Sequence, residues 1–262
     1  MRAFACVLAA SALLSGAAEA APRRVASLNL CTDELLLTLA EPGQIASVTY
    51  LAQQPEESSL WRQGRAYPKN DGSLISVIGY RPDLVLAMGG GGRDSALIAR
   101  RLGIQVLNLP YPESIGDMEA MVLRVAHVLG RDAAGRAIVA ETEQLKGSRP
   151  SRSVDTIWLG EGGLTRSANG LGADWMALAG LRQRAMPGDR VTLEQLVAAP
   201  PAILLRSDYR SGQYSANERW LAHPLVQRAR AGRTIRIDGR PWTCLGPPMI
   251  DEVRRLRATV MP

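Results

Sequence analysis

The sequence predicts an α/β protein built as two lobes with parallel sheets, and three observations support this class. Apolar runs typical of strands alternate with segments of helical spacing along the chain, as in parallel strands joined by helical crossovers. The stretch GSRPSRS at 147–153 is the one clear break in composition near mid-chain. The segments on either side of this break repeat one order of elements.

The first twenty residues are predicted to be a secretory signal peptide and are left out of the fold. Arg2 gives a charged start, residues 3–14 are mainly apolar, and small residues flank Glu19. Cleavage is expected near Ala20. No cysteine suited to a lipid anchor follows, and no later stretch is apolar enough for a membrane span. We therefore expect an exported protein.

Composition limits the partners and the redox chemistry. The 262 residues carry a formal net charge of +6, which fits an anionic ligand or partner but equally a surface of solvated arginines. No block of Lys and Arg alternates with aromatic residues, so no nucleic-acid partner is expected. After signal removal two cysteines remain, Cys31 and Cys244, and they either form one disulfide or stay apart as core thiols.

The first lobe is predicted from apolar runs and helix signals in chain order. An acidic first turn at Asp33 begins one helix, and Pro82 ends another. Residues 52–72 are polar and rich in turn formers, which predicts a loop. The predicted strands are Val25–Leu30, Ile45–Tyr50, Asp83–Ala87 and Gln105–Leu109. The predicted helices are Asp33–Ala40, Leu74–Tyr80 and Asp94–Leu102.

Two helices and a second lobe follow. Apolar residues recur at helical spacing over Ile115–Gly130 and again over Ala133–Leu145. Beyond the composition break, Val154–Leu159 predicts the first strand of the second lobe. The segment at 192–206 aligns without gaps to the segment at 73–87, so that Pro201 matches Pro82. This internal repeat predicts two lobes of related plan: strand, loop, helix, then short helix, proline and strand.

The four glycines Gly89–Gly92 lie between a predicted strand and a predicted helix, where a phosphate-binding loop would lie. A P-loop needs Gly-Lys-Ser/Thr at its end, but Gly92 is followed by Arg93 and Asp94. The spaced glycines of a dinucleotide fingerprint are also missing. We interpret the loop as a plain turn or as backbone that lines a ligand site, because glycine allows close approach.

Signals for catalysis are weak elsewhere. The histidines, His127 and His223, are far apart in the sequence, and a metal site draws three or four ligands. No Gly-x-Ser-x-Gly elbow presents a nucleophile. We therefore expect no enzyme, no resident metal and no cofactor. The alternative of an exported α/β enzyme that uses Gly89–Gly92 is kept for comparison.

Several segments together resemble one family, the periplasmic substrate-binding proteins of ABC importers for vitamin B12, ferric siderophores and haem. The segment RVASLNLCTDELLLTLA resembles the opening strand and helix of that family, and SLISVIGYRPDLVLAMGG resembles its short helix and following strand and loop. RRLGIQVLNLP, VTLEQLVAAPPAILL and ERWLAHPLVQRARAGRTIRID resemble its later landmarks. Each motif is short, but their number and order span the mature chain.

The resemblance implies two Rossmann-like lobes joined by one long α-helix, with the ligand cleft between the lobes. On this sequence it implies a signal peptide at 1–20, a first lobe at 21–130, a linking helix at 131–150 and a second lobe at 151–262. The protein would be a monomer in the periplasm that binds a small-molecule metal chelate and delivers it to an ABC permease in the inner membrane. A sensor or scaffold of the same fold, or a receptor for a free metal ion, are the alternatives.

The resemblance also implies which residues line the cleft, because loops at the carboxyl ends of parallel strands face it. Aromatic rings would offer flat area to a chelate, and arginines would pair with anionic oxygens. The predicted ligand-binding residues are Asn29, Cys31, Tyr50, Trp61, Tyr67, Met88, Gly89, Gly90, Arg93, Arg166, Tyr209, Trp242 and Cys244.

Two further expectations follow from the resemblance. The loops of Cys31 and Cys244 should border the cleft from opposite lobes, where the thiols either form a disulfide, act as a soft-metal thiolate pair, or remain separate. The family docks on its permease through one acidic residue of each lobe, and Glu194 matches the second of these positions. The matching first-lobe residue is Ile75, which is not acidic, so that contact is missing or is made by Asp71.

Overall fold

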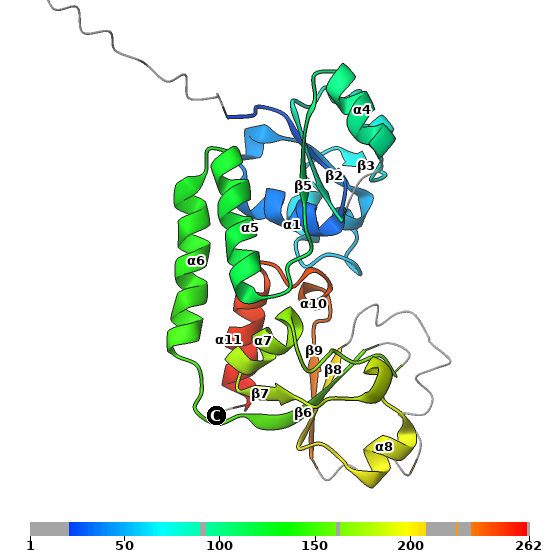
Figure 1. Ribbon diagram of the computed structural model, residues 1–262, viewed down its shortest axis with the longest axis vertical. Helices are drawn as coiled ribbons and strands as arrows, with labels where there is room; N and C mark the ends of the chain where they lie inside the picture. Colours follow the sequence, from blue (N-terminus) through cyan, green and yellow to red (C-terminus); the bar gives the residue numbers. More distant parts are fainter. Residues whose placement is uncertain (1–20, 90–92, 161–162, 208–223, 225–231, 261–262) are drawn as a thin grey trace, which may run out of the picture.

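The computed structural model describes residues 21–89, 93–160, 163–207, 224 and 232–260. They form two α/β lobes, stacked one above the other in Figure 1, with a pair of helices along one side. No helix among these residues is both long and apolar enough to cross a membrane. The signal peptide predicted at 1–20 lies outside the described residues.

The first lobe contains a five-stranded parallel sheet in the order β3-β2-β1-β4-β5. Alternate residues of β1 and β4 face opposite helix layers: Val25 and Leu86 join the core under α1 and α5, while Ala26 and Val85 pack under α3 and α4. The strands are β1 Val25–Ser27, β2 Ile45–Thr49, β3 Lys69–Asn70, β4 Leu84–Met88 and β5 Gln105–Leu109. The helices are α1 Leu30–Leu39, α2 Trp61–Gly64, α3 Leu74–Ile78 and α4 Arg93–Arg101, with 3-10 turns at Pro42–Gln44 and Tyr50–Gln53.

The second lobe contains a four-stranded parallel sheet in the order β7-β6-β8-β9. This order matches β2-β1-β4-β5 of the first lobe, in agreement with the two lobes of related plan that the internal repeat predicts. The strands are β6 Val154–Leu159, β7 Leu181–Gln183, β8 Ile203–Ser207 and β9 Arg233–Ile237. The helices are α7 Leu171–Leu178, α8 Leu193–Ala198, α10 Pro241–Cys244 and α11 Met249–Val260, with a 3-10 turn at Pro187–Asp189.

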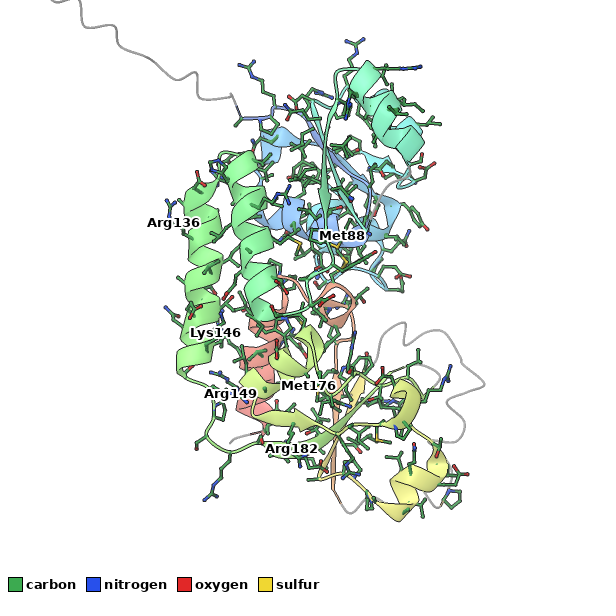
Figure 2. The ribbon with its side chains drawn as sticks, in the orientation of Figure 1. Met88, Arg136, Lys146, Arg149, Met176 and Arg182 are labelled. Carbon is green, nitrogen blue, oxygen red and sulfur yellow. A yellow bond between two sulfur atoms is a disulfide. The ribbon has the colours of Figure 1, made fainter. Side chains whose placement is uncertain are left out.

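Helices α5 (Ile115–Val128) and α6 (Asp132–Gly147) form a hairpin that connects the two lobes along one side of the molecule. A Cβ on Gly135 of α6 would lie 2.5 Å from the Cβ of Ala126 in α5, so the two helices pack closely because this residue is glycine. Lys146, labelled near the end of α6 in Figure 2, forms a 2.7 Å ion pair with Glu119 of α5. In Figure 1 the hairpin runs along one side of the molecule, beside part of each lobe, and α6 leads into β6.

The two lobes share one continuous hydrophobic core. Buried side chains of the first sheet, of α5 and of the second sheet belong to a single cluster. At the C-terminus Arg257 of α11 donates hydrogen bonds of 2.6 Å to the carbonyls of Leu178 and Leu145, which end α7 and lie near the end of α6. These contacts hold the hairpin firmly against the second lobe.

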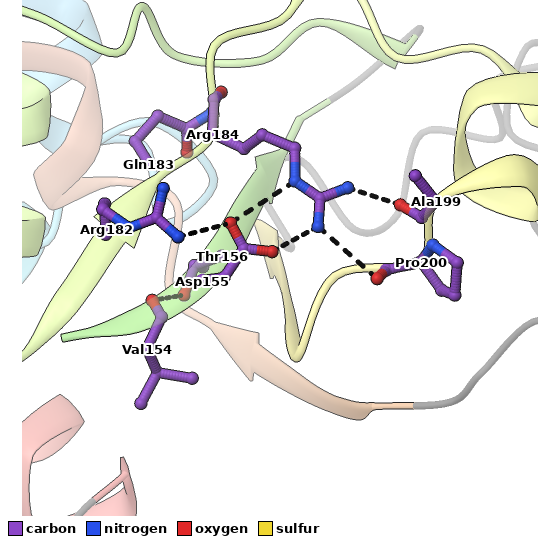
Figure 3. Close-up of polar contacts among 8 residues, drawn as sticks. All are labelled: Val154, Asp155, Thr156, Arg182, Gln183, Arg184, Ala199 and Pro200. Carbon is purple, nitrogen blue, oxygen red and sulfur yellow. Dashed lines mark hydrogen bonds and ion pairs between the residues drawn. The ribbon is translucent and has the colours of Figure 1, made fainter.

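Arg182 and Arg184 bind Asp155 near the amino end of β6 (Figure 3). Arg182 donates to Asp155 at 3.2 Å, and Arg184 donates to both oxygens of the same carboxylate. Arg184 also donates to the carbonyls of Ala199 and Pro200, so this cluster ties β6 and β7 to the turn before β8. The cluster stabilises the sheet and is remote from the carboxyl edge.

Two sequence expectations are corrected by the structure. The first strand ends at Ser27 and not at Leu30, because Asn29 caps a helix that already begins at Leu30. The predicted loop at 52–72 contains the short helix α2 and the short strand β3, which pairs with β2 at the sheet edge. Elements this short leave no periodic pattern in the sequence.

Candidate functional site between the lobes

The carboxyl ends of the two sheets face each other across the junction of the lobes. A disulfide joins Cys31, which follows β1, to Cys244, which follows β9, with the two Cα atoms 5.2 Å apart. Helix α10, which carries Cys244, lies between the lobes in Figure 1. Loops at this edge of open parallel sheets are the usual ligand-binding loops of α/β proteins. The junction is therefore the candidate site.

The turn that presents Cys31 is held by its neighbours. Asn29 accepts hydrogen bonds from the backbone N–H groups of Cys31, at 2.8 Å, and Thr32, at 3.3 Å. The Thr32 hydroxyl lies 2.7 Å from the hydroxyl of Ser27 on β1. Asn29, predicted as a ligand residue, therefore serves as the N-cap that fixes the first turn of α1.

Two buried acids follow Cys31 in α1. Asp33 accepts hydrogen bonds from the backbone N–H of Thr49, at 2.9 Å, and from its hydroxyl. Burial is the largest influence and raises the pKa of Asp33 to about 6, although these hydrogen bonds oppose it. Burial, aided by the charge of Asp33, raises the pKa of Glu34 well above its ordinary value. Asp33 thus faces β2, whereas Glu34 faces the loop after Cys244, since its Oε2 lies 3.3 Å from the place a Cβ would occupy on Gly246.

The first-lobe rim carries exposed aromatic residues. Tyr50, directly after β2, is 46% exposed, and Tyr111, shortly after β5, is 63% exposed. Gly89 after β4 adopts a positive φ of +77°, and a Cβ there would lie only 2.6 Å from the ring of Tyr111. Gly89 therefore lets the Tyr111 ring lie on the backbone at this edge. Met88, labelled in Figure 2, is buried in the core at the end of β4.

Helix α2 places an aromatic side chain with two cations on the same rim. The guanidinium groups of Arg62 and Arg65 each lie 4.5 Å from the centroid of the half-buried Trp61 ring. Tyr67 is half-buried and packs against the main core, and its carbonyl accepts a 2.8 Å hydrogen bond from Gln53. The rim thus combines flat apolar area with positive charge.

The second-lobe side is built on Trp158, Arg166 and Trp242. The Arg166 guanidinium lies 4.6 Å from the Trp158 ring centroid and donates to the Trp242 carbonyl. Burial lowers the pKa of Arg166, and its Nε finds no acceptor within the described part of the chain. Trp242 is fully buried, with its ring centroid 6.1 Å from that of Trp158. This cluster holds α10 on the end of β6.

Other contacts join the lobes beside the disulfide. Arg240 donates from Nη1 to the Pro55 carbonyl of the first lobe at 2.7 Å, and Asp238 orients its guanidinium through hydrogen bonds of 2.7 and 2.8 Å. Both lobes and α6 line a cavity of about 440 Å³ next to this contact. Among its lining residues are Leu37, Gln63, Ile138, Pro247 and Arg255. None of the predicted ligand residues lines this cavity.

Of the three alternatives left open for Cys31 and Cys244, the structure contains the disulfide, so in this state the two sulfur atoms do not form a thiolate pair. Gly90 and Tyr209 lie outside the described residues, as does the side chain of Arg93, the first residue of α4. Glu194 and Ile75 lie in α8 and α3, the short helices that the repeat equates, and Ile75 is 75% exposed. The ligand and docking roles remain predictions.

Sequence reasoning missed three residues at the junction. Tyr111 lies in the run after β5, and its position after a strand end was the available signal. Trp158 lies inside an apolar strand, where nothing in the sequence separates a ring that supports the site from an ordinary core residue. Glu34 directly follows Asp33 at the acidic start of a helix, and its burial against a loop far along the chain leaves no local pattern.

Neither a protein-family model nor a curated protein matches the sequence. Solved structures match it by fold. Periplasmic heme-binding protein BhuT in complex with two hemes is 21% identical, covers 91% of this chain and 97% of its own, and gives a TM-score of 0.68. Heme-binding protein RhuT from Roseiflexus sp. RS-1 in apo form is 19% identical, covers 91% of this chain and 99% of its own, and gives a TM-score of 0.69. Vitamin B12 binding protein BtuF of Vibrio cholerae is 14% identical, covers 90% of this chain and 96% of its own, and gives a TM-score of 0.64. The chain therefore has the fold of these periplasmic binding proteins.

Proposed function

We propose that this protein is the periplasmic solute-binding component of an ABC importer and captures a metal-chelate nutrient between its lobes. The observation that carries the proposal is the fold, shared over about nine-tenths of the chain with proteins described as binding haem or vitamin B12. The carboxyl edges of both sheets meet at one junction, as this function requires. A sensor or scaffold of the same fold remains the second candidate, and an enzyme is not favoured.

The residues at the junction support a large, flat and anionic ligand. Tyr50, Tyr111 and Trp61 offer ring faces to a porphyrin, a corrin or a catecholate. The exposed cations Arg62 and Arg65 can pair with carboxylates or other anionic oxygens. This balance favours a ferric siderophore or haem over the less charged cobalamin.

The direct test is the thermal midpoint of the purified mature protein with haem, cobalamin and several ferric siderophores. A ligand that binds only the folded state adds about 2.7 kcal/mol of stability at a hundredfold excess over its Kd. We expect one compound to raise the midpoint by several degrees. If none of these compounds raises the midpoint, the result favours a sensor or scaffold over a receptor.

Glu194 supplies a second test, which concerns delivery. Its carboxylate is exposed in the first turn of α8, and hydrogen bonds from its own backbone N–H and from Thr192 lower its pKa, so it is charged at neutral pH. We expect Glu194→Arg to reduce transport in cells at least about tenfold while ligand affinity stays unchanged, since a reversed interface charge costs more than 1.4 kcal/mol.

The matched variant is Ile75→Glu, which places an acid at the equivalent position of the first lobe. It should leave affinity unchanged and should not lower transport. Equal losses of transport and affinity in Glu194→Arg would mean that Glu194 does not belong to a docking surface.

A further inference from the structure

The interlobe disulfide lies next to a buried carboxyl group that has no assigned role. Glu34 is only 1% exposed, and neither of its oxygens has a hydrogen-bond partner within the described residues. It follows Cys31 by three positions in α1, which places both side chains on one face of the helix. Its Oε2 lies 3.3 Å from the place a Cβ would occupy on Gly246, just after Cys244. The carboxyl is thus next to both halves of the bridge.

A contribution to stability does not explain why a carboxyl group is buried at position 34. A buried polar group without a partner costs free energy, and an apolar side chain would fill the same position at lower cost. Asp33 is the charged neighbour that acts on Glu34, while the facing loop at 245–248 contains Leu, Gly and two Pro residues, none of which titrates. Burial, aided by the charge of Asp33, raises the pKa of Glu34 well above its ordinary value, which favours the protonated form of this carboxyl next to the disulfide.

The two cysteines are placed for exchange chemistry. Both residues are half-buried and not fully buried, and partial exposure is what exchange with a small dithiol requires. Cys31 is the second residue of the ten-residue helix α1, and the positive end of a helix dipole stabilises a thiolate formed there. A stabilised thiolate is also the better leaving group in disulfide exchange.

We propose that Cys31–Cys244 is a site of reversible thiol–disulfide exchange with a dithiol reductant, at which Glu34 is the proton donor. One thiolate of the dithiol attacks the Cys244 sulfur. The S–S bond breaks, its electron pair leaves on the Cys31 sulfur, and Glu34 gives that sulfur its proton. The second thiol of the reductant then closes its own disulfide and releases Cys244 as a thiol, while water returns a proton to Glu34. The dithiol is oxidised by two electrons and the bridge is reduced by two.

This exchange removes the one covalent tie between α1 and α10. The hydrogen bond from Arg240 to Pro55 and the α5–α6 hairpin remain. After reduction the lobes are therefore held together by the hairpin and by noncovalent contacts.

The test is the rate of reduction of the native protein by dithiothreitol between pH 5 and 9. Free thiols are trapped by alkylation and counted by mass, and each rate is divided by the concentration of dithiothreitol thiolate. We expect Glu34→Gln, nearly equal in size, to react at least about tenfold more slowly than wild type below the pH at which Glu34 ionises. The two rates should converge above that pH. Glu143→Gln, an exposed α6 change, should behave as wild type.

Equal rates for Glu34→Gln and wild type at every pH would overturn the proposal. So would a reduction rate that is independent of dithiothreitol concentration, because the bridge would then react only after unfolding. If Glu34→Gln does not fold, the wild-type profile decides. A rate per thiolate that falls as Glu34 ionises supports the proton donor, and a constant rate contradicts it.

Discussion

Replacement of Cys31 and Cys244 together by serine is expected to lower the free energy of unfolding by about 2–5 kcal/mol. The bridge joins residues 213 positions apart, so its loss frees a long loop in the unfolded chain. It also removes the covalent tie between helices of opposite lobes. For a protein of this size the change corresponds to a fall of roughly 5–15 °C in the unfolding midpoint.

Urea unfolding with and without reductant measures this effect. Wild type in full reductant should approach the double variant, and the double variant should not respond to reductant. A double variant as stable as the oxidised wild type would mean that the bridge does not constrain the lobes in solution.

Replacement of Trp242 by alanine is expected to cost about 3–5 kcal/mol. The side chain is fully buried, its ring packs near that of Trp158, and Arg166 anchors the same residue through its carbonyl. Deleting the ring leaves a large cavity beneath α10. The expected readout is a large loss of stability by thermal or urea unfolding.

Trp61→Ala is the matched control, because both tryptophans are predicted from the sequence to contact ligand. Trp61 is half-buried on the short helix α2, so its loss should cost about 1 kcal/mol or less. Its ring lies on the rim between two arginines, so the same change should weaken ligand binding. Wild-type stability in Trp242→Ala together with lost binding would instead place Trp242 in the ligand contact.

Much of the fold was predictable because each lobe repeats strong periodic signals. The strands at Gln105–Leu109 and Val154–Leu159 lie where their apolar runs predict them. The repeat of short helix, proline and strand predicted two lobes of related plan, and the matching strand orders of the two sheets agree with it. The end of β1 was not predictable, because it depends on which residue caps the next helix, and apolar Leu28 and Leu30 continue the strand pattern.

The site was less predictable, because burial and pairing at the junction depend on residues far apart in the chain. The number of cysteines did not decide whether Cys31 and Cys244 form a disulfide, because that depends on the proximity of α1 and α10 in the fold. Trp242 and Tyr50 looked alike in sequence as aromatic residues on loops, yet one is fully buried and the other is 46% exposed. The Tyr111 ring packs on the backbone of Gly89, and no local pattern in the sequence indicates this contact.

Hydrogen exchange of the protein with and without the compound that raises its thermal midpoint tests the interlobe site most directly. The account predicts slower exchange in segments that follow strands of both lobes, namely around Tyr50 and Tyr111 in the first and around Arg166 in the second. The linking helix α6 should be little affected, since the disulfide and the shared core limit closure. Protection confined to one lobe, or to the cavity beside α6, would contradict a ligand held between the lobes.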